Sequence, residues 1–311
     1  MFPLSSVNKT ASFVLNNGIT KLAVPFFFIS SGYFLSNKIN NWSSTKIYIL
    51  KILKMYIIWT IIYIPLIAFS WVKYGWDIAF FIKASVFAGT YLHFWYLTAL
   101  IFASAFLYFG LKKISLKNLF FIALILFFIG LMGQPYYTLT EKSLLLTKLF
   151  NYYFKIFLTV RNGLFFGLVF MIIGMLIKDK KFPNKRNCII GLAISFIMIF
   201  FEIFFLKNFL NTEAFDIYIS LLPASYFLFA LILQIKLPDK NYFYYLRQMS
   251  LLIFLSHPLM RFFSELFVKI NNVFDHSMMR YLVVLFFSIA FSAGVVFIEN
   301  KKGFKWLKFL H

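Results

Sequence analysis

The sequence predicts an all-α protein, a polytopic integral membrane bundle of about nine transmembrane helices. The first observation is composition: the 311 residues are 62% hydrophobic and only 13% charged, with a mean hydropathy of +0.83. The second is pattern, because the apolar residues form long unbroken runs that favour helices over a β-barrel. The third is charge, since Lys and Arg gather in the short connections between these runs.

Nine apolar runs come close to the ~20 residues that a helix needs to cross the hydrocarbon core of a bilayer. They cover roughly residues 19–36, 50–70, 93–111, 118–133, 160–177, 188–206, 216–235, 249–270 and 279–298. Two aromatic connections, 76–92 and 141–159, are predicted to form helices on the outer membrane surface. We therefore expect a single membrane domain over residues 1–311, with an external N-terminal segment (1–18) and a basic cytoplasmic tail (299–311).

The distribution of basic residues predicts the orientation. Of the 31 Lys and Arg residues, 19 lie in one alternate set of connections: 37–54, 112–117, 178–187, 236–247 and 299–311. By the positive-inside rule this set is cytoplasmic, which places the C-terminus inside and the N-terminus outside a plasma membrane. This topology also accounts for the net charge of +21, and nucleic acid is not an expected partner because no soluble basic domain could bind it.

The single cysteine and the N-terminal segment each allow one inference. The lone Cys188 excludes a disulfide framework and a cysteine metal cluster, and no metal site is expected. An outside N-terminus needs translocation, yet the opening MFPLSSVNKT has no signal peptide before it. We therefore expect the natural protein to carry one further membrane-spanning helix upstream.

Four apolar strings carry a resemblance to a known family. They are AVPFFFISSGYFL (23–35), LHFWYLTALI (92–101), RNGLFFGLVFMIIGMLI (161–177) and SLLIFLSHPL (250–259). In this order they resemble the membrane acyltransferase family 3, in the branch with sugar O-acetyltransferases and the membrane halves of serine racemases. The resemblance covers nearly the whole chain.

The resemblance implies ten helices and the transfer of an acyl group, which is expected to be acetyl. The donor would be acetyl-CoA, a co-substrate from the cytoplasm rather than a bound cofactor. The acceptor would be a hydroxyl or amine of an extracytoplasmic glycan or of its lipid-linked precursor. The family's first helix, with an Arg and a His as catalytic base, would precede Met1, so the chain as written is expected to transfer slowly.

Three residues are candidates for catalysis: His93, Arg161 and His257. His93 stands beside Trp95, whose ring could stack on a sugar; the alternative is an interfacial aromatic belt. Arg161 and Asn162 open the fifth predicted span as a donor pair that binds substrate; the alternative is a helix cap with a headgroup anchor.

The stripe formed by His257, Arg261 and Glu265 has the spacing of one helix face. Ionisable residues inside a membrane are expensive, which makes such a stripe a candidate site. The alternative is a hydrogen bond for His257 and an Arg–Glu pair near the outer headgroups. Glu202, near the outer end of the sixth predicted span, is interpreted as a snorkelling side chain.

The inner half of the first predicted span supplies the candidates for coenzyme binding, Ser31 and Tyr33, together with Lys51 and Lys54. The lysines could hold the phosphates of acyl-CoA, or serve topology alone. The small residues around Gly32 could instead permit close helix packing.

Two other functions stay open at this point. The first is a transporter or flippase for a glycan intermediate or a small amino acid, although neither an inverted repeat nor a pair of Gly/Pro-broken helices is apparent. The second is an inactive, truncated acyltransferase. Membrane lipid is an expected partner, and the sequence sets no oligomeric state.

Overall fold

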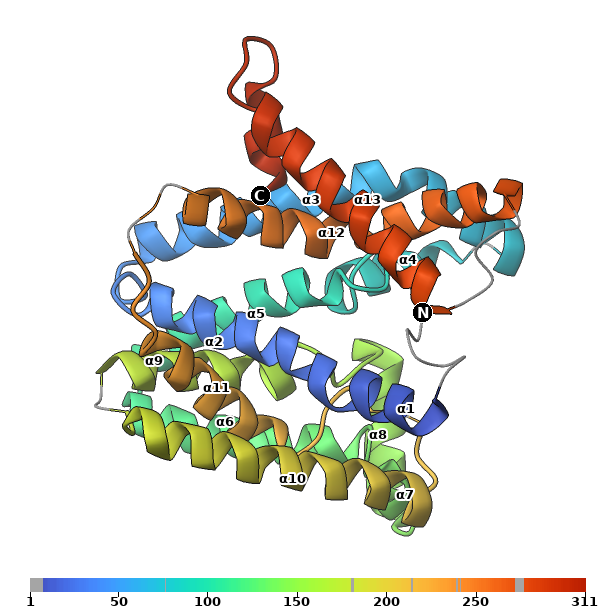
Figure 1. Cartoon of the computed structure of the whole chain (residues 1–311). Helices are drawn as coiled ribbons and strands as arrows, with labels where there is room; N and C mark the ends of the chain where they lie inside the picture. Colours follow the sequence, from blue (N-terminus) through green and yellow to red (C-terminus); the bar gives the residue numbers. More distant parts are fainter. Residues whose placement is uncertain are drawn as a thin grey trace. The chain divides into compact units, whose positions relative to one another are not determined.

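The prediction of an all-α protein is confirmed by a computed structural model of the chain (Figure 1), which describes residues 8–75, 77–179, 182–213, 215–238, 240, 242–271 and 277–311. Within these ranges all regular secondary structure is helical. The chain forms two units that are treated separately below. Unit 1 comprises Met1–Asn16, Lys54–Lys73 and Leu237–His311, and unit 2 comprises Asn17–Leu53 and Tyr74–Lys236.

The apolar helices are those of a membrane protein. In the described ranges, four are long and apolar enough to cross a bilayer: Lys9–Leu35, Trp42–Val72, Lys185–Phe209 and Met278–Ile298. Four shorter apolar helices are Ile78–Phe87, Trp95–Leu111, Leu116–Met132 and Leu221–Leu233. The count of nine spans stays a prediction. The predicted span 216–235 is shorter than expected, because its helix begins at Leu221.

The helices of unit 2 follow in chain order. They are η1 (Ile19–Leu22), α2 (Ala23–Leu35), α4 (Ile78–Phe87), α5 (Trp95–Leu111), α6 (Leu116–Met132), α7 (Tyr137–Thr140), α8 (Leu144–Phe157), the π-helical turn η2 (Gly163–Gly167), α9 (Leu168–Asp179), α10 (Lys185–Phe209) and α11 (Leu221–Leu233). Side chains of Asp77, Ser115, Ser143 and Asn184 cap the N-termini of α4, α6, α8 and α10. Helices are thus present in both connections predicted to lie on the membrane surface.

The core of unit 2 is the crossing of α2 and α9. Helix α9 is apolar on all sides, and nine of its twelve residues are buried. A methyl group added at Gly32 would overlap the carbonyl of Met171, and one added at Gly174 would overlap the carbonyl of Ile29. Two glycines therefore let the backbones touch, which confirms the packing interpretation of the small residues around Gly32.

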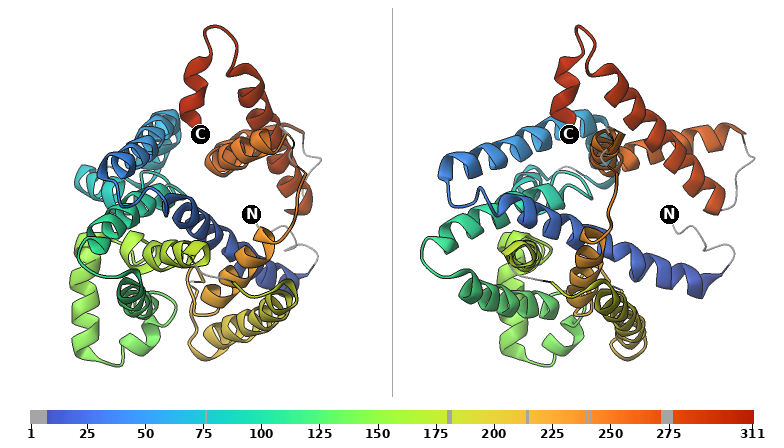
Figure 2. Two further views of the ribbon diagram at one scale, coloured as in Figure 1. Left: turned by 90° about the vertical axis from the view of Figure 1, so that its left-hand side faces the viewer. Right: turned by 60° about the vertical axis from the view of Figure 1, so that its left-hand side comes forward.

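Unit 1 is built from part of α3 (Trp42–Tyr74), from α12 (Tyr242–Asn271), α13 (Ser277–Ile298) and η3 (Lys305–Leu310), and from most of α1 (Lys9–Asn17). Figure 2 shows the C-terminal segment turning back toward α3. There the buried indole of Trp59 donates to the carbonyl oxygen of Leu310 at 3.0 Å. The basic tail is thus folded, with Leu307 and Leu310 buried. Residues 1–7 of the predicted N-terminal segment lie outside the described residues.

A proline in the middle of α12 is accommodated by two side chains. Pro258 has no N–H, so the carbonyl of Phe254 loses its helical partner; Nδ1 of His257 lies 2.8 Å from that oxygen. The hydroxyl of Tyr63, on α3, donates to Leu255 O at 2.8 Å and accepts from Leu259 N at 3.2 Å. The helix therefore continues through Pro258 because these groups satisfy its interrupted ladder.

Candidate functional site

A charged cluster gathers on Asp216, in the connection between α10 and α11. Oδ1 of Asp216 accepts from Nζ of Lys21 at 2.7 Å, and Oδ2 accepts from Nη1 of Arg161 at 2.8 Å and from Nε2 of Gln134 at 3.0 Å. We call these four residues the Asp216 cluster. About a third or less of each charged side chain is exposed, at 27% for Lys21, 30% for Asp216 and 33% for Arg161. The cluster is thus partly shielded but still accessible.

Arg161 is held over the ring of Trp95. Its guanidinium carbon lies 5.5 Å from the ring centroid, within the range of a cation–π interaction. The ring is fixed in turn by Phe166, at 5.7 Å between centroids. The backbone N–H of Arg161 donates to Oγ1 of Thr159 at 3.0 Å, which sets the loop that leaves α8. Two residues singled out from sequence, Arg161 and Trp95, are therefore brought together.

The loop that carries Asp216 is anchored on both sides. Glu202, on α10, accepts from the backbone N–H groups of Ile219 and Ser220 at 2.7 Å each, from the hydroxyl of Ser220, and from Tyr136 at 2.6 Å. The hydroxyl of Tyr218 donates to Gly18 O at 3.0 Å. Glu202 therefore holds the start of α11 rather than snorkelling, and the snorkelling interpretation is wrong.

Electrostatics make Asp216 an orienting group. Burial alone raises the pKa of Asp216, but Arg161 and then Lys21 outweigh it, so the pKa lies below its usual value of 3.8. A carboxylate so far below neutral pH is a poor general base, because the best catalytic pKa lies near the operating pH. The cluster holds two cations on one anion. Its net charge of about +1 suits an anionic or carbonyl oxygen.

Gln134 adds a polar atom to the cluster. Its Nε2 donates to Asp216, while among the described residues its buried Oε1 has no hydrogen-bond partner. Buried polar atoms are nearly always satisfied in proteins. The Oε1 atom can thus accept a hydrogen bond from a hydroxyl or an amine. These are the two groups that are expected from the sequence to receive the acyl group.

His93 lies in the turn before α5 rather than on the helix. Gly89, with φ +84°, begins this turn, and a methyl group there would lie 2.5 Å from the carbonyl carbon of Phe94. The His93 ring is 4.3 Å from the ring of Phe94 and 6.1 Å from that of Tyr91. This aromatic setting is that of the belt interpretation, but it also places His93 two residues from Trp95; its catalytic role stays a prediction.

Asn162 uses its side chain within the protein. Its Oδ1 accepts from Leu164 N and Phe165 N at 3.0 Å each, which caps the π-helical turn η2, and its Nδ2 donates to the hydroxyl of Tyr153 at 2.6 Å and to the carbonyl oxygen of Thr159 at 3.0 Å. The sequence-based alternative of a helix cap is therefore realised. Substrate binding by Asn162 stays a prediction.

The candidates for coenzyme binding fall in both units. In unit 2, Ser31 Oγ lies 3.5 Å from the hydroxyl of Tyr96, and Nζ of Lys178 lies 5.2 Å from the centroid of the Tyr33 ring. Lys51 is exposed on α3. In unit 1, Lys54 is also exposed. Coenzyme binding by these four residues stays a prediction.

The stripe on α12 belongs to unit 1. Arg261 Nε donates to Glu265 Oε1 at 2.8 Å, so the expected Arg–Glu pair is present. His257 is exposed and contacts the carbonyl freed by Pro258. This contact supports the structural alternative for the stripe, while catalysis by His257 stays a prediction.

Sequence reasoning missed Lys21, Gln134 and Asp216. A weak signal existed, since Asp216 is one of ten acidic residues in the chain and stands at the edge of an apolar run. A lone acid in such a setting needs a basic partner. What could not be seen is which of 31 basic residues provides it.

Comparisons with known proteins now add to this geometry. A family model described as an acyltransferase domain matches residues 2–298. Two proteins of Enterococcus faecalis named amino-acid racemase are similar, one 31% identical over 75% of this chain and 33% of its own length, the other 27% identical over 96% and 44%. A serine/alanine racemase of Enterococcus gallinarum is 28% identical over 93% of this chain and 42% of its own length. The chain thus spans less than half the length of these relatives. No solved structure matches it.

Proposed function

The chain belongs to the membrane acyltransferase 3 family, an enzyme family that transfers acyl groups other than aminoacyl groups, and from this premise we propose that it transfers an acetyl group from cytoplasmic acetyl-CoA. The proposed acceptor is a hydroxyl or amine of a cell-envelope glycan or of its lipid-linked precursor, on the outer side of the plasma membrane. The observation that carries the proposal is the Asp216 cluster beside Trp95.

The cluster supports an acceptor site for a saccharide. The part of the Trp95 ring that stays exposed beside the Arg161 guanidinium offers apolar surface to a sugar ring, while Gln134 Oε1 can accept from a hydroxyl. Arg161, fixed by Asp216, can donate to the oxygen that gains charge as the thioester carbonyl is attacked. The side chains of Trp95, Gln134 and Arg161 are each partly exposed, although the Oε1 atom of Gln134 is itself buried.

The reaction needs a base that the cluster does not supply. The acceptor oxygen attacks the carbonyl carbon of the thioester, the new C–O bond forms as the C–S bond breaks, and the acceptor proton passes through the base to the departing thiolate. Imidazole is the side chain whose ordinary pKa suits this task. His93, near Trp95 in the turn before α5, is our candidate for orienting or deprotonating the acceptor.

The proposal is tested by labelled acetyl-CoA and envelope glycans in cells with and without the gene. We expect acetylation that depends on the gene, and we expect His93→Ala to reduce it by about 10²-fold or more, the usual value of general-base help, without loss of expression. Gene-independent acetylation would contradict the function. Near-normal transfer by His93→Ala would return that residue to the aromatic belt.

The orientation is tested separately. In a Cys188→Ser background, single cysteines within 138–148 should react with an impermeant reagent from outside, whereas cysteines within 178–186 should not. Labelling of 178–186 from outside would overturn the proposed topology and with it the external acceptor site.

A second candidate function is passage of a small amino acid through the membrane. The relatives that share this region carry names of enzymes that act on amino acids, serine and alanine among them. Uptake of labelled serine by proteoliposomes, with no acyl transfer from acetyl-CoA, would favour this function over the first.

A further inference from the structure

An apolar pocket of about 300 Å³ lies against the loop that carries Arg161. Its walls come from α4, α5, α8 and η2, through the side chains of Phe87, Phe102, Phe106, Tyr153, Phe157 and Leu164. The volume is about twice that of a cavity of ~150 Å³ that binds benzene. It is therefore large enough for a segment of a hydrocarbon chain.

The polar groups at the pocket are already engaged with each other. The hydroxyl of Tyr153 donates to Thr159 O at 2.9 Å and accepts from Asn162 Nδ2 at 2.6 Å, and Asn162 Oδ1 serves the N–H groups of η2. A ligand in the pocket is thus offered apolar surface rather than hydrogen bonds. Pockets that recognise polar ligands keep a few polar groups for them, so this pocket suits hydrocarbon.

The pocket and the Asp216 cluster share one loop. Asn162 lines the pocket, and the preceding residue, Arg161, enters the cluster, where two cations face one carboxylate. Hydrocarbon on one side and a net positive charge on the other are complementary to an amphiphile with an anionic head. Neither feature alone would require such a ligand.

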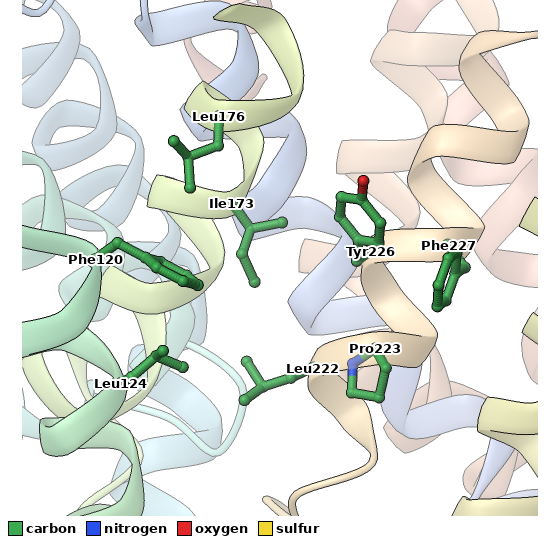
Figure 3. A pocket seen from close by; sticks show the side chains of 8 residues that line it. All are labelled: Phe120, Leu124, Ile173, Leu176, Leu222, Pro223, Tyr226 and Phe227. Atoms are coloured by element: carbon green, nitrogen blue, oxygen red, sulfur yellow. The ribbon is translucent and has the colours of Figure 1, made fainter. Parts of the chain in front are cut away.

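A second apolar pocket of about 250 Å³ provides an internal comparison (Figure 3). Its lining comes from α6, α9 and α11 and includes Leu124, Ile173 and Tyr226, with no charged side chain. Any lipid tail suits it equally well. The pocket at α8 differs because one of its lining residues, Asn162, directly follows Arg161 of the Asp216 cluster in the chain.

We propose that the pocket at α8 holds the hydrocarbon chain of a lipid-linked acyl acceptor whose anionic phosphate head lies at the Asp216 cluster. This inference rests on the proposed function and names the acceptor's chemical class. The predicted topology puts the loop 134–159 outside, opposite the entry of acyl-CoA, so the acceptor rather than the donor is the expected occupant. The pocket then holds the acceptor by its tail while the cluster orients its head.

The test uses the full chain in nanodiscs and a polyprenyl phosphate that carries a photoreactive diazirine in its chain. We expect labels on Phe102, Phe106 or Leu164, and we expect unlabelled polyprenyl phosphate to compete them away in the wild-type protein. Leu164→Trp, which fills the pocket, should reduce labelling at least fivefold. Leu124→Trp, the same substitution in the second pocket, should leave labelling unchanged.

Two further probes separate the possible occupants. A diazirine phosphatidylglycerol that labels the same residues equally well would show that the pocket takes ordinary lipid and would overturn the proposal. Uncharged polyprenol should label at least threefold less than the phosphate, and Arg161→Gln should remove this difference. Equal labelling by alcohol and phosphate in the wild-type protein would overturn the role of the cluster.

Labelling and acyl transfer are measured on parallel samples of one preparation. The transfer samples contain labelled acetyl-CoA and a polyprenyl phosphate that carries a sugar, because polyprenyl phosphate alone has no hydroxyl or amine to acylate. Transfer that persists while labelling is absent would overturn the pocket assignment and leave the proposed function standing. Labelling without any transfer would overturn the proposed function and the acceptor role, while the ligand class of the pocket would be supported. Melting temperatures of the variants show whether a loss reflects unfolding, and competition in the wild-type protein does not depend on any variant.

Discussion

Units 1 and 2 each contain a carboxylate paired with cations or potential cations, but the two pairs differ in exposure. In unit 1, Glu299 has a side chain only 2% exposed, with Nε2 of His311 2.5 Å from Oε2 and Nε2 of Gln248 3.3 Å from Oε1. In unit 2, the side chain of Asp216 is 30% exposed. The first pair is sealed and ties the C-terminal segment to its unit, whereas the second can still meet a ligand.

The two units also differ in how closely their helices pack at glycine positions. Gly174, in unit 2, stands where the backbones of α2 and α9 touch, while Gly294, in α13 of unit 1, has no atom within 4 Å of an added methyl group. Unit 2 thus holds its helices by close backbone contact. The difference suggests that a precise site needs the more tightly packed unit, because side chains are best held by rigid elements.

The largest effect is expected from Gly174→Ala. The added methyl group would overlap the carbonyl of Ile29, and overpacking typically costs about 1–3 kcal/mol, more where backbone must move. We expect a loss of about 3 kcal/mol in the free energy of unfolding, measured by thermal or denaturant unfolding in detergent. The matched control, Gly294→Ala, should stabilise by about 0.5–1 kcal/mol. Equal effects would show that the two units pack alike.

His311→Ala is expected to destabilise unit 1 without affecting transfer. It leaves Oε2 of the buried Glu299 carboxylate without the His311 contact, with only Gln248 still bonded to Oε1, and an unsatisfied buried polar group costs about 1–3 kcal/mol. The free energy of unfolding should fall by that amount, while the rate per folded molecule stays within about twofold. A large loss of rate at unchanged stability would contradict a purely structural role for the sealed pair.

Asp216→Asn should reduce the rate of acyl transfer and leave stability almost unchanged, the reverse of His311→Ala. The amide keeps the shape but no longer holds the charges of Lys21 and Arg161, so the guanidinium is less well fixed over Trp95. We expect acyl transfer to fall about tenfold, which corresponds to about 1.4 kcal/mol, with a change in unfolding free energy below about 1 kcal/mol. Initial rates with labelled acetyl-CoA test this, with Glu299→Gln as the matched carboxylate-to-amide control.

Trp95→Leu isolates the contact between the guanidinium and the ring. A cation–π interaction at a partly exposed site is worth about 0.5–1 kcal/mol, so transfer should fall about two- to fivefold. The rate of transfer should fall less in Trp95→Phe, because an aromatic ring remains beneath Arg161. If Phe and Leu behaved alike, shape rather than the cation–π contact would explain the role of Trp95.

The smallest effect concerns pH. The folded-state pKa of Asp216 lies below its unfolded value, so its ion pairs stabilise the protein above the unfolded pKa of about 3.9 and are lost as pH falls through the folded pKa. The difference in melting temperature between the wild-type protein and Asp216→Asn should therefore be constant from pH 5 to 8 and shrink below about pH 4. A difference that shrinks between pH 8 and 5 would mean that the pKa is raised instead.

The sequence by itself determined the class of the molecule. Long apolar runs require helices, because backbone groups in hydrocarbon must pair within their own segment. The same local logic predicted helices where α4 and α8 stand and singled out Arg161 and Trp95 as candidates. It left close packing at Gly32 as one of two interpretations. Each of these inferences uses residue types and spacings within a single segment.

The tertiary structure alone decided the partners. Lys21 meets Asp216 across 195 residues of sequence, and Gln134 meets it across 82. Tyr63 completes the helix around Pro258 from 192 residues away. No periodicity encodes such pairs, since the energy of one charge or hydrogen bond depends on which groups the packed helices bring within about 3 Å of each other. The composition of the site is therefore a property of the fold, although the capacity to form it is written in single residues.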